Sequence, residues 1–190
     1  MSKQISIDQA VEMIKDCMTV MIGGFLAVGS PNKIIEAIVK AGKKNLTVIC
    51  NDTSYPEIGS GLLVASGCVK KVIASHIGTN PITEQKMKEG TMEVELVPQG
   101  TLAERVRIGG AGIGGFLTAT GVGTLAAEGK RTIEVDGKEY LLELPLRADV
   151  ALIGASVADK HGNLIYRGTS QNFNPLMATA ADLVIAEVSE

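Results

Sequence analysis

Short apolar runs that alternate with helical segments are the feature that most limits how this chain can fold. Four of these runs have the length of strands: residues 18–22, 46–50, 71–74 and 94–97. Such runs are typical of strands that are buried on both faces of a parallel sheet. Parallel neighbours need a crossover, which the intervening helical segments supply. The pattern therefore predicts an α/β fold with a mostly parallel open sheet covered by helices.

A β-hairpin interrupts this alternation in the second half of the chain. Two apolar-rich segments, residues 131–135 and 138–142, flank Asp136-Gly137, a dipeptide that strongly favours a tight hairpin turn. Apolar strands resume after it, at residues 150–153 and 183–186. No linker-like tract divides the sequence, and 190 residues suit one core. We expect residues 1–190 to form a single domain with an inserted β-hairpin.

The first strand ends in a glycine-rich turn. Gly23-Gly24-Phe25 follows the strand, and Ser30-Pro31 predicts the N-cap and the first position of the next helix. Glycines at the carboxyl end of a strand leave backbone N–H groups accessible, which suits an anionic or carbonyl-bearing ligand. A side chain at Gly24 would then intrude on ligand space. Such turns are also common packing devices, so a structural role stays open.

Polar residues follow the other strands of the predicted sheet. They are Asn51-Asp52, Ser75-His76 and Gln99-Gly100. Because the carboxyl ends of parallel strands meet at one edge of a sheet, we expect these residues to form a ligand-binding edge. The alternative is that Asn51 caps the next helix and Gln99 closes a turn. No obvious nucleophile accompanies them, so the pattern indicates a binding half-site.

Composition and motif spacing argue against several classes of function. The net charge of -3, without clustered basic residues, gives no reason to expect nucleic-acid binding. Neither His76 nor His161 has a second ligand at metal-binding spacing, so no metal site is expected. There is no Gly-x-Ser-x-Gly elbow of a serine hydrolase. Residues 110–115 fit Gly-x-Gly-x-x-Gly, but they follow a predicted helix rather than a strand.

Cysteine usage and the N-terminus favour a cytoplasmic protein. Three cysteines without paired spacing read as free thiols in a reducing compartment. The N-terminus leads into a capped helix rather than a signal peptide. Between Arg107 and Glu128 lies an uncharged stretch, but its seven glycines and three threonines make it a poor membrane helix. We expect it to be a buried or ligand-lining loop system, with no membrane association.

Several motifs in a fixed order resemble those of family I CoA-transferase α subunits, over almost the whole chain. The first is the stretch from Asp16 to Pro31, in which Cys17 departs from the Gly or Asn that the family more often has. The others are Asn51-Asp52-Thr53 and residues 75–81, 97–101, 109–112, 120–124 and 172–175. The likeness is closest to the branch of the family that acts on acetate, butyrate and acetoacetate.

This resemblance implies a two-subunit enzyme that moves coenzyme A (CoA) between short-chain acyl-CoA thioesters, such as acetyl-CoA and butyryl-CoA, and acids such as acetoacetate. The family's nucleophile is a Glu in a Ser-Glu-Asn-Gly run of the β subunit, and the reaction proceeds by ping-pong steps through a glutamyl-CoA thioester. This chain has no such run, since its terminal Ser189-Glu190 lacks the Asn-Gly. The resemblance thus implies no catalytic nucleophile here, a β-subunit partner and an α2β2 assembly.

The same resemblance assigns roles to particular residues. The residues that would lie along CoA are Gly23, Gly24, Phe25, Leu26, Ala27, Val28 and Gly29. Asn51 and Gln99 would position the substrate carboxylate or acyl oxygen. Independently of the resemblance, the uncharged glycine segment at residues 109–124 is expected to form a subunit interface or an active-site wall, and a purely structural role is the open alternative. Family α subunits normally continue further, so a shortened carboxyl end is expected. A second reading is a non-catalytic module of the same fold that binds CoA or a sugar phosphate.

Overall fold

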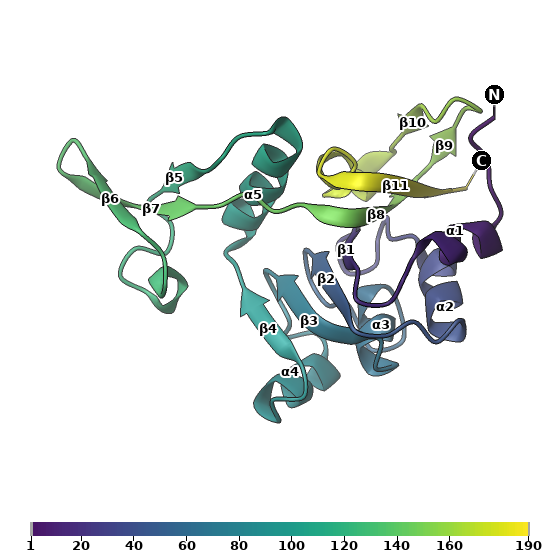
Figure 1. The fold of residues 1–190 in the computed structure, drawn as a ribbon, viewed down its shortest axis with the longest axis horizontal. Helices are drawn as coiled ribbons and strands as arrows, with labels where there is room; N and C mark the ends of the chain where they lie inside the picture. Colours follow the sequence, from purple (N-terminus) through teal and green to yellow (C-terminus); the bar gives the residue numbers. More distant parts are fainter. Residues whose placement is uncertain (1, 190) are drawn as a thin grey trace.

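The structure, a computed structural model, describes residues 2–189 and is built around a six-stranded parallel sheet (Figure 1). The strand order is β11-β8-β1-β2-β3-β4, and all neighbouring strands are parallel. The strands are β1 (Thr19–Ile22), β2 (Leu46–Cys50), β3 (Val69–Ala74), β4 (Glu93–Leu96), β8 (Ala148–Ala155) and β11 (Ala181–Val188). The predicted α/β fold with a mostly parallel sheet is confirmed.

Helices cover both faces of this sheet. One face is covered by α1 (Ile7–Met13), α2 (Asn32–Lys40), α3 (Ser60–Ala65) and α4 (Pro81–Lys88), and the other by α5 (Gln99–Ala111) and α6 (Asn174–Met177). Along β1, Val20 and Ile22 belong to the apolar cluster under the first group of helices, and Met21 belongs to the second cluster. Both faces of the strand are buried, which explains its unbroken apolar run.

The order of the strands reverses at β1. Strands β1 to β4 follow one another outward across the sheet, whereas β8 and β11 lie on the other side of β1. In open α/β sheets, ligands bind beyond the carboxyl ends of the strands. The loops that leave β1 to β4 at this edge are therefore where a site is expected.

A separate three-stranded sheet projects from one end of the molecule (Figure 1). We call residues 113–144 the hairpin lobe; it holds β5 (Phe116–Thr118), the 3-10 helix η1 (Leu125–Ala127), β6 (Thr132–Val135) and β7 (Lys138–Glu143). Its antiparallel order is β5-β7-β6. Asp136 (φ 51°) and Gly137 (φ 73°) close the predicted turn in left-handed conformations. A smaller hairpin, β9 (Val157–Ala158) with β10 (Leu164–Ile165), precedes the 3-10 helix η2 (Gly168–Ser170).

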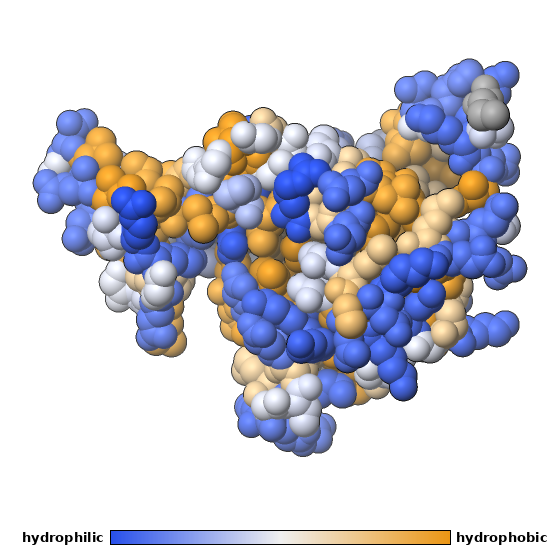
Figure 2. Space-filling model, in the orientation of Figure 1, coloured by the Kyte–Doolittle hydropathy of each residue, from blue (hydrophilic) through white to orange (hydrophobic). Residues whose placement is uncertain are grey.

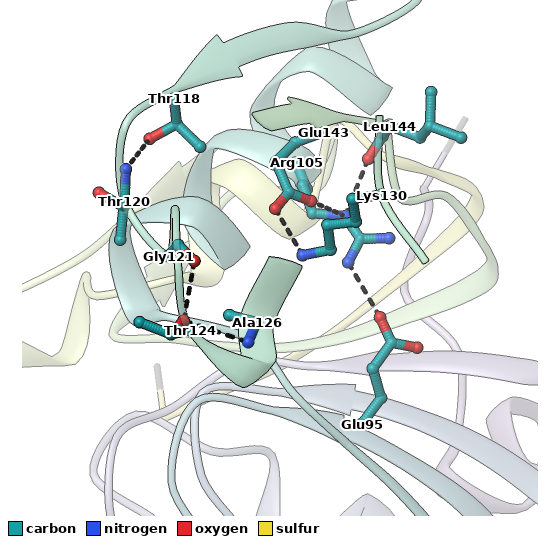
Figure 3. A network of polar contacts seen from close by, with 10 residues as sticks. All are labelled: Glu95, Arg105, Thr118, Thr120, Gly121, Thr124, Ala126, Lys130, Glu143 and Leu144. Carbon is teal, nitrogen blue, oxygen red and sulfur yellow. Dashed lines mark hydrogen bonds and ion pairs between the residues drawn. The ribbon is translucent and has the colours of Figure 1, made fainter. Parts of the chain in front are cut away.

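A polar network joins the hairpin lobe to the main sheet (Figure 3). Glu143, at the end of β7, is 2% exposed and points between Lys130 and Arg105. Lys130 Nζ lies 2.5 Å from Glu143 Oε1, and Arg105 Nε lies 3.8 Å from Glu143 Oε2. Arg105 Nε also donates to the Leu144 carbonyl, and its Nη1 lies 3.0 Å from Glu95 Oε1 on β4. One arginine on α5 thus connects β4 to the lobe.

Three local expectations are wrong. Ser30 is not the N-cap of α2; Pro31 holds that position, while the Ser30 hydroxyl donates to the Gly23 carbonyl at 2.8 Å. The sequence pattern predicts a helix over residues 102–108, but α5 begins earlier, at Gln99, so Gln99 lies in the first turn of a helix. The stretch between Arg107 and Glu128 is not one buried loop: α5 continues to Ala111, β5 follows, and much of the remainder is exposed within this chain.

Candidate functional site

A cavity of about 410 Å³ lies at the carboxyl ends of β1 to β4. Its lining comes from the loops after all four strands: Phe25, Leu26, Asn51, Asp52, Ser75, His76, Thr79 and Gln99. This is the edge at which parallel sheets bind ligands. The four polar strand ends that were expected to meet at one edge therefore contribute to a single hollow.

The centre of the cavity is a pair of side-chain amides. Gln99 Nε2 donates to Asn51 Oδ1 at 2.8 Å. The Ser75 hydroxyl lies 2.7 Å from the Asn51 carbonyl oxygen and 3.2 Å from Asn51 Oδ1. Asn51 is only 1% exposed, whereas Gln99 is exposed. The pair therefore presents Gln99 to a ligand and keeps Asn51 behind it.

The carboxylate of Asp52 lies beneath this amide pair and is 5% exposed. It accepts hydrogen bonds from Asn51 Nδ2 at 2.7 Å, from the Ser54 N–H at 2.8 Å and from the Leu26 N–H at 3.1 Å. No ion pair in the described part of the chain includes Asp52. Its negative charge is therefore stabilised by N–H donors, as buried carboxylates require.

A tight turn forms the wall of the cavity on the β1 side. The Phe25 N–H donates to the Val28 carbonyl at 3.1 Å, and the Val28 N–H donates to the Phe25 carbonyl at 2.9 Å. Between them, Leu26 (φ 48°) and Ala27 (φ 66°) both adopt left-handed conformations. Such conformations cost non-glycine residues about 1–2 kcal/mol each. The surrounding contacts, including the one from Asp52, hold this turn in place.

The glycines before this turn leave room for protein rather than for a ligand. A Cβ at Gly23 would lie 1.7 Å from Asn174 Oδ1, and one at Gly24 would lie 1.9 Å from Ser30 Oγ. Gly24 also has a φ of +121°, which side chains rarely adopt. The expectation that a side chain at Gly24 would intrude on ligand space is therefore wrong, because Ser30 fills that space.

The residues predicted to lie along CoA are divided between two hollows. Phe25 and Leu26 line the cavity together with Asn51 and Gln99. Ala27 and Gly29 line a second cavity of about 330 Å³, beside the loop that follows β8. Of the remainder, Gly23 and Gly24 are buried beneath the turn, and Val28 is exposed.

Two further cavity residues had no role assigned from the sequence. His76 belongs to the polar edge that the sequence predicts and Thr79 to the 75–81 motif, but neither had a particular role assigned to it. The Thr79 hydroxyl donates to the Ser54 carbonyl at 2.8 Å, which ties the β2 and β3 loops together. Both His76 and Thr79 lie beyond the carboxyl end of β3, and this position in the sequence could have identified them as residues of the site.

The buried thiol near the site is not poised for nucleophilic attack. Burial, and then the negative charge of Asp52, raise the pKa of Cys50 to about 12, against a weaker opposing effect of a hydrogen bond with Ser60. A thiol with this pKa stays protonated at neutral pH and is a poor nucleophile. Burial also raises the pKa of Cys68, and the charge of Asp16 acts in the same direction.

Residues 2–189 contain neither a metal-binding cluster nor a helix able to span a membrane. No cluster of three or more histidine, cysteine, aspartate or glutamate side chains is arranged to hold a metal ion. None of the helices within this range combines the length and the apolar character needed to cross a bilayer.

Comparison with known proteins agrees with the fold and identifies the family. The model of the coenzyme A transferase family matches residues 4–190. The chain is 52% identical over 189 residues to the acetate CoA-transferase subunit alpha of Escherichia coli (strain K12), covering 100% of this chain and 86% of that protein. It is 55% identical over 186 residues to the acetoacetyl-CoA:acetate/butyrate CoA transferase alpha subunit of Clostridium acetobutylicum, covering 98% and 85%.

A solved structure supports the same fold. The crystal structure of the acyl-CoA transferase YdiF apoenzyme from Escherichia coli O157:H7 superposes with a TM-score of 0.84 at 22% identity, over 98% of this chain and 42% of that chain. The chain belongs to the coenzyme A transferase family. The resemblance inferred from the motifs is thereby confirmed, and with it the class of enzyme.

Proposed function

We propose that this chain is the α subunit of a CoA-transferase that moves CoA between short-chain acyl-CoA thioesters, such as acetyl-CoA or butyryl-CoA, and acids such as acetoacetate. The activities for which the two relatives are named support this substrate class, and both proteins are named as alpha subunits. A β subunit would complete the site with the glutamate of a Ser-Glu-Asn-Gly run. The glutamyl-CoA thioester would form on that glutamate, within an α2β2 assembly.

The observation that carries the proposal is the exposed Gln99 amide, held by buried Asn51 in a cavity whose described lining contains no glutamate. An amide N–H can donate to an acyl or carboxylate oxygen as negative charge develops on it, and it has no protonation state to control. In this arrangement Gln99 contacts the substrate oxygen and Asn51 holds Gln99. The site binds and polarises the substrate, and the attacking group comes from the partner.

CoA is the substrate that membership of the family implies. We place its reacting end at the Phe25–Leu26 side of the cavity, facing Gln99. Ala27, Val28 and Gly29 would lie beside the remainder of the molecule, while the buried Gly23 and Gly24 would support the turn from beneath. We place the enzyme in the cytoplasm, since Cys50 and Cys68 are buried free thiols that suit a reducing compartment.

The test uses the chain co-purified with its β subunit. The pair should form acetoacetyl-CoA from acetyl-CoA and acetoacetate, and neither subunit alone should do so. Gln99→Ala should lower kcat about 100- to 1000-fold, as loss of one donor to a developing oxyanion does. Gln85→Ala is the matched control, because Gln85 is exposed on α4 and does not line the cavity. If the pair bound CoA but did not transfer it, the alternative of a non-catalytic binding module of the same fold would be favoured instead.

A further inference from the structure

We propose that Asp52 is a positioning residue for CoA transfer. Its carboxylate sets the orientation of the Asn51–Gln99 amide pair and holds the Phe25-to-Val28 turn against that pair. The inference rests on the proposed function, in which Gln99 contacts the substrate oxygen. It adds a residue that acts on the substrate indirectly, through Asn51 and Gln99 on one side and the Phe25-to-Val28 turn on the other.

The contacts of Asp52 extend beyond those of an ordinary turn. Its bond from the Ser54 N–H, two residues on, is the local contact that aspartates commonly make after strands. The bonds from Asn51 Nδ2 and from the Leu26 N–H instead involve a second side chain and a loop 26 residues away. Because Asp52 is only 5% exposed, water cannot replace these donors, and the loss of one donor leaves a buried polar group without a partner.

A carboxylate beside Asn51 determines which way both amides face. An ionised carboxylate only accepts hydrogen bonds, so the Asn51 amide must turn its NH₂ group toward Asp52. Asn51 Oδ1 is thereby directed to Ser75 and Gln99. Gln99 must in turn direct Nε2 toward that oxygen. Hydrogen-bond donation thus runs from Gln99 to Asn51 and from Asn51 to Asp52, and the negative charge of Asp52 fixes this direction.

The same carboxylate holds the turn that forms another part of the cavity wall. It accepts the N–H of Leu26, the first of two residues that hold left-handed conformations in the turn. Phe25 and Leu26 line the same cavity as Gln99. Strained conformations persist only where neighbouring groups hold them. Asp52 therefore fixes the distance between the amide pair and the turn as well as the direction of the amides.

Asp52→Asn tests this inference in the complete pair of subunits. An asparagine keeps the shape but offers one acceptor oxygen to three N–H donors, so its NH₂ group must face one of them. We expect kcat to fall about 10- to 100-fold, the scale of losses that follow small misplacements of reacting groups. An unchanged kcat would overturn the inference.

A double-mutant cycle separates positioning from general damage. Because Asp52 acts partly through Gln99 and partly through the turn, the loss of kcat caused by Asp52→Asn should be at least about threefold smaller once Gln99→Ala is already present. Equal losses in the two backgrounds would mean that Asp52 acts independently, and the inference would be wrong. The wild-type pair tests the proposed function in the same assay. Absence of CoA transfer by that pair would refute the proposed function, and this inference with it.

Ser60→Ala is the matched control for stability. The Ser60 hydroxyl is buried and donates to the backbone carbonyl of Asp52 at 2.8 Å, without touching its carboxylate. It should lower Tm while leaving kcat unchanged.

If Asp52→Asn does not assemble with the partner, the exchange Asn51→Asp/Asp52→Asn replaces it, because that pair keeps one carboxylate and one amide. The kcat of the double variant Asn51→Asp/Asp52→Asn should be at least about tenfold higher than that of Asn51→Asp alone. Equal kcat values for these two variants would overturn the inference.

Discussion

Cys17 holds a backbone conformation that suits glycine better than cysteine. Its φ of 67° lies in the left-handed region, just before β1, where its N–H donates to the Lys44 carbonyl at 3.1 Å. A Cβ in this region costs about 1–2 kcal/mol, and the greater freedom of glycine in the unfolded chain offsets about half of that. The side chain is exposed, so little packing offsets the strain.

We therefore expect Cys17→Gly to raise the free energy of unfolding by about 0.5–1 kcal/mol. At this chain length the gain corresponds to a rise in Tm of about 1–3 °C. Differential scanning calorimetry in the presence of a reducing agent measures it. Cys17→Ala is the control, because alanine removes the thiol and keeps the strain. Equal stabilisation by both variants would show that the thiol, and not φ, is responsible.

The residues of the site were only partly predictable. Asn51 and Gln99 could be expected to meet, because both follow parallel strands and the carboxyl ends of such strands share an edge. The reason for the glycines at positions 23 and 24 could not be predicted. Gly23 makes way for Asn174, 151 positions later in the chain, and nothing in the local pattern indicates that contact. Contacts between distant segments follow from the folded topology and not from turn chemistry.

At the scale of elements, the strands of the main sheet were predictable, whereas helix starts and edge structures were not. Apolar runs locate buried strands because both faces must be covered. Pro98-Gln99-Gly100 has the composition of a loop, yet α5 starts at Gln99, with the Leu102 N–H donating to the Pro98 carbonyl at 2.8 Å. The short strand β5 has only three residues and forms by pairing with β7, so its sequence carries little signal.

Glu143 is the residue on which the attachment of the hairpin lobe depends. Glu143→Gln removes the negative charge between Lys130 and Arg105, both of which are largely buried. We expect the free energy of unfolding to fall by about 2–3 kcal/mol, as when one partner of a buried ion pair is removed. Urea denaturation measures this loss, and hydrogen exchange should show that β5 to β7 lose protection first.

The matched control lies on the same helix. Arg107 pairs with Glu104 at 2.8 Å on the exposed side of α5. Arg107→Ala should cost less than about 0.5 kcal/mol, because solvent weakens exposed ion pairs. If Glu143→Gln and Arg107→Ala lowered the free energy of unfolding by similar amounts, the ion pairs of Glu143 would have no special role in attaching the lobe.

The edge strand β4 contributes to the dependence of stability on pH. Burial works to raise the pKa of Glu95, but the hydrogen bonds and charges of Arg105 and Lys71 outweigh it and lower this pKa from 4.5. The unfolded chain therefore binds a proton at Glu95 more readily than the folded chain does. This stabilisation is present above about pH 4.5 and is lost as the pH falls through the folded pKa. Urea denaturation from pH 6 to pH 3 should give a smaller loss of stability in Glu95→Gln than in the wild type; parallel curves would contradict this.

At the scale of the whole molecule, the hairpin lobe carries apolar surface that this chain does not cover. Figure 2 shows apolar side chains on the projecting end of the molecule. The large exposed apolar residues of the lobe are Ile113 (43%), Leu117 (39%), Leu125 (84%), Val135 (41%) and Leu144 (58%). Exposed apolar side chains gathered on one part of a molecule are typical of protein interfaces. We therefore retain the prediction that residues 109–124, with the lobe that they enter, contact a partner subunit.

Leu125→Ser tests this interface. Because Leu125 is 84% exposed, the change should leave the stability of the free chain unchanged. If the β subunit covers the lobe, burial of this side chain contributes about 1–2 kcal/mol to association, so Kd should rise about 5- to 30-fold. Ile165→Ser is the control, since Ile165 is 59% exposed on β10, outside the lobe, and should leave Kd unchanged. Titration calorimetry of the two subunits measures both, and equal effects at the two positions would show that the lobe is not the interface.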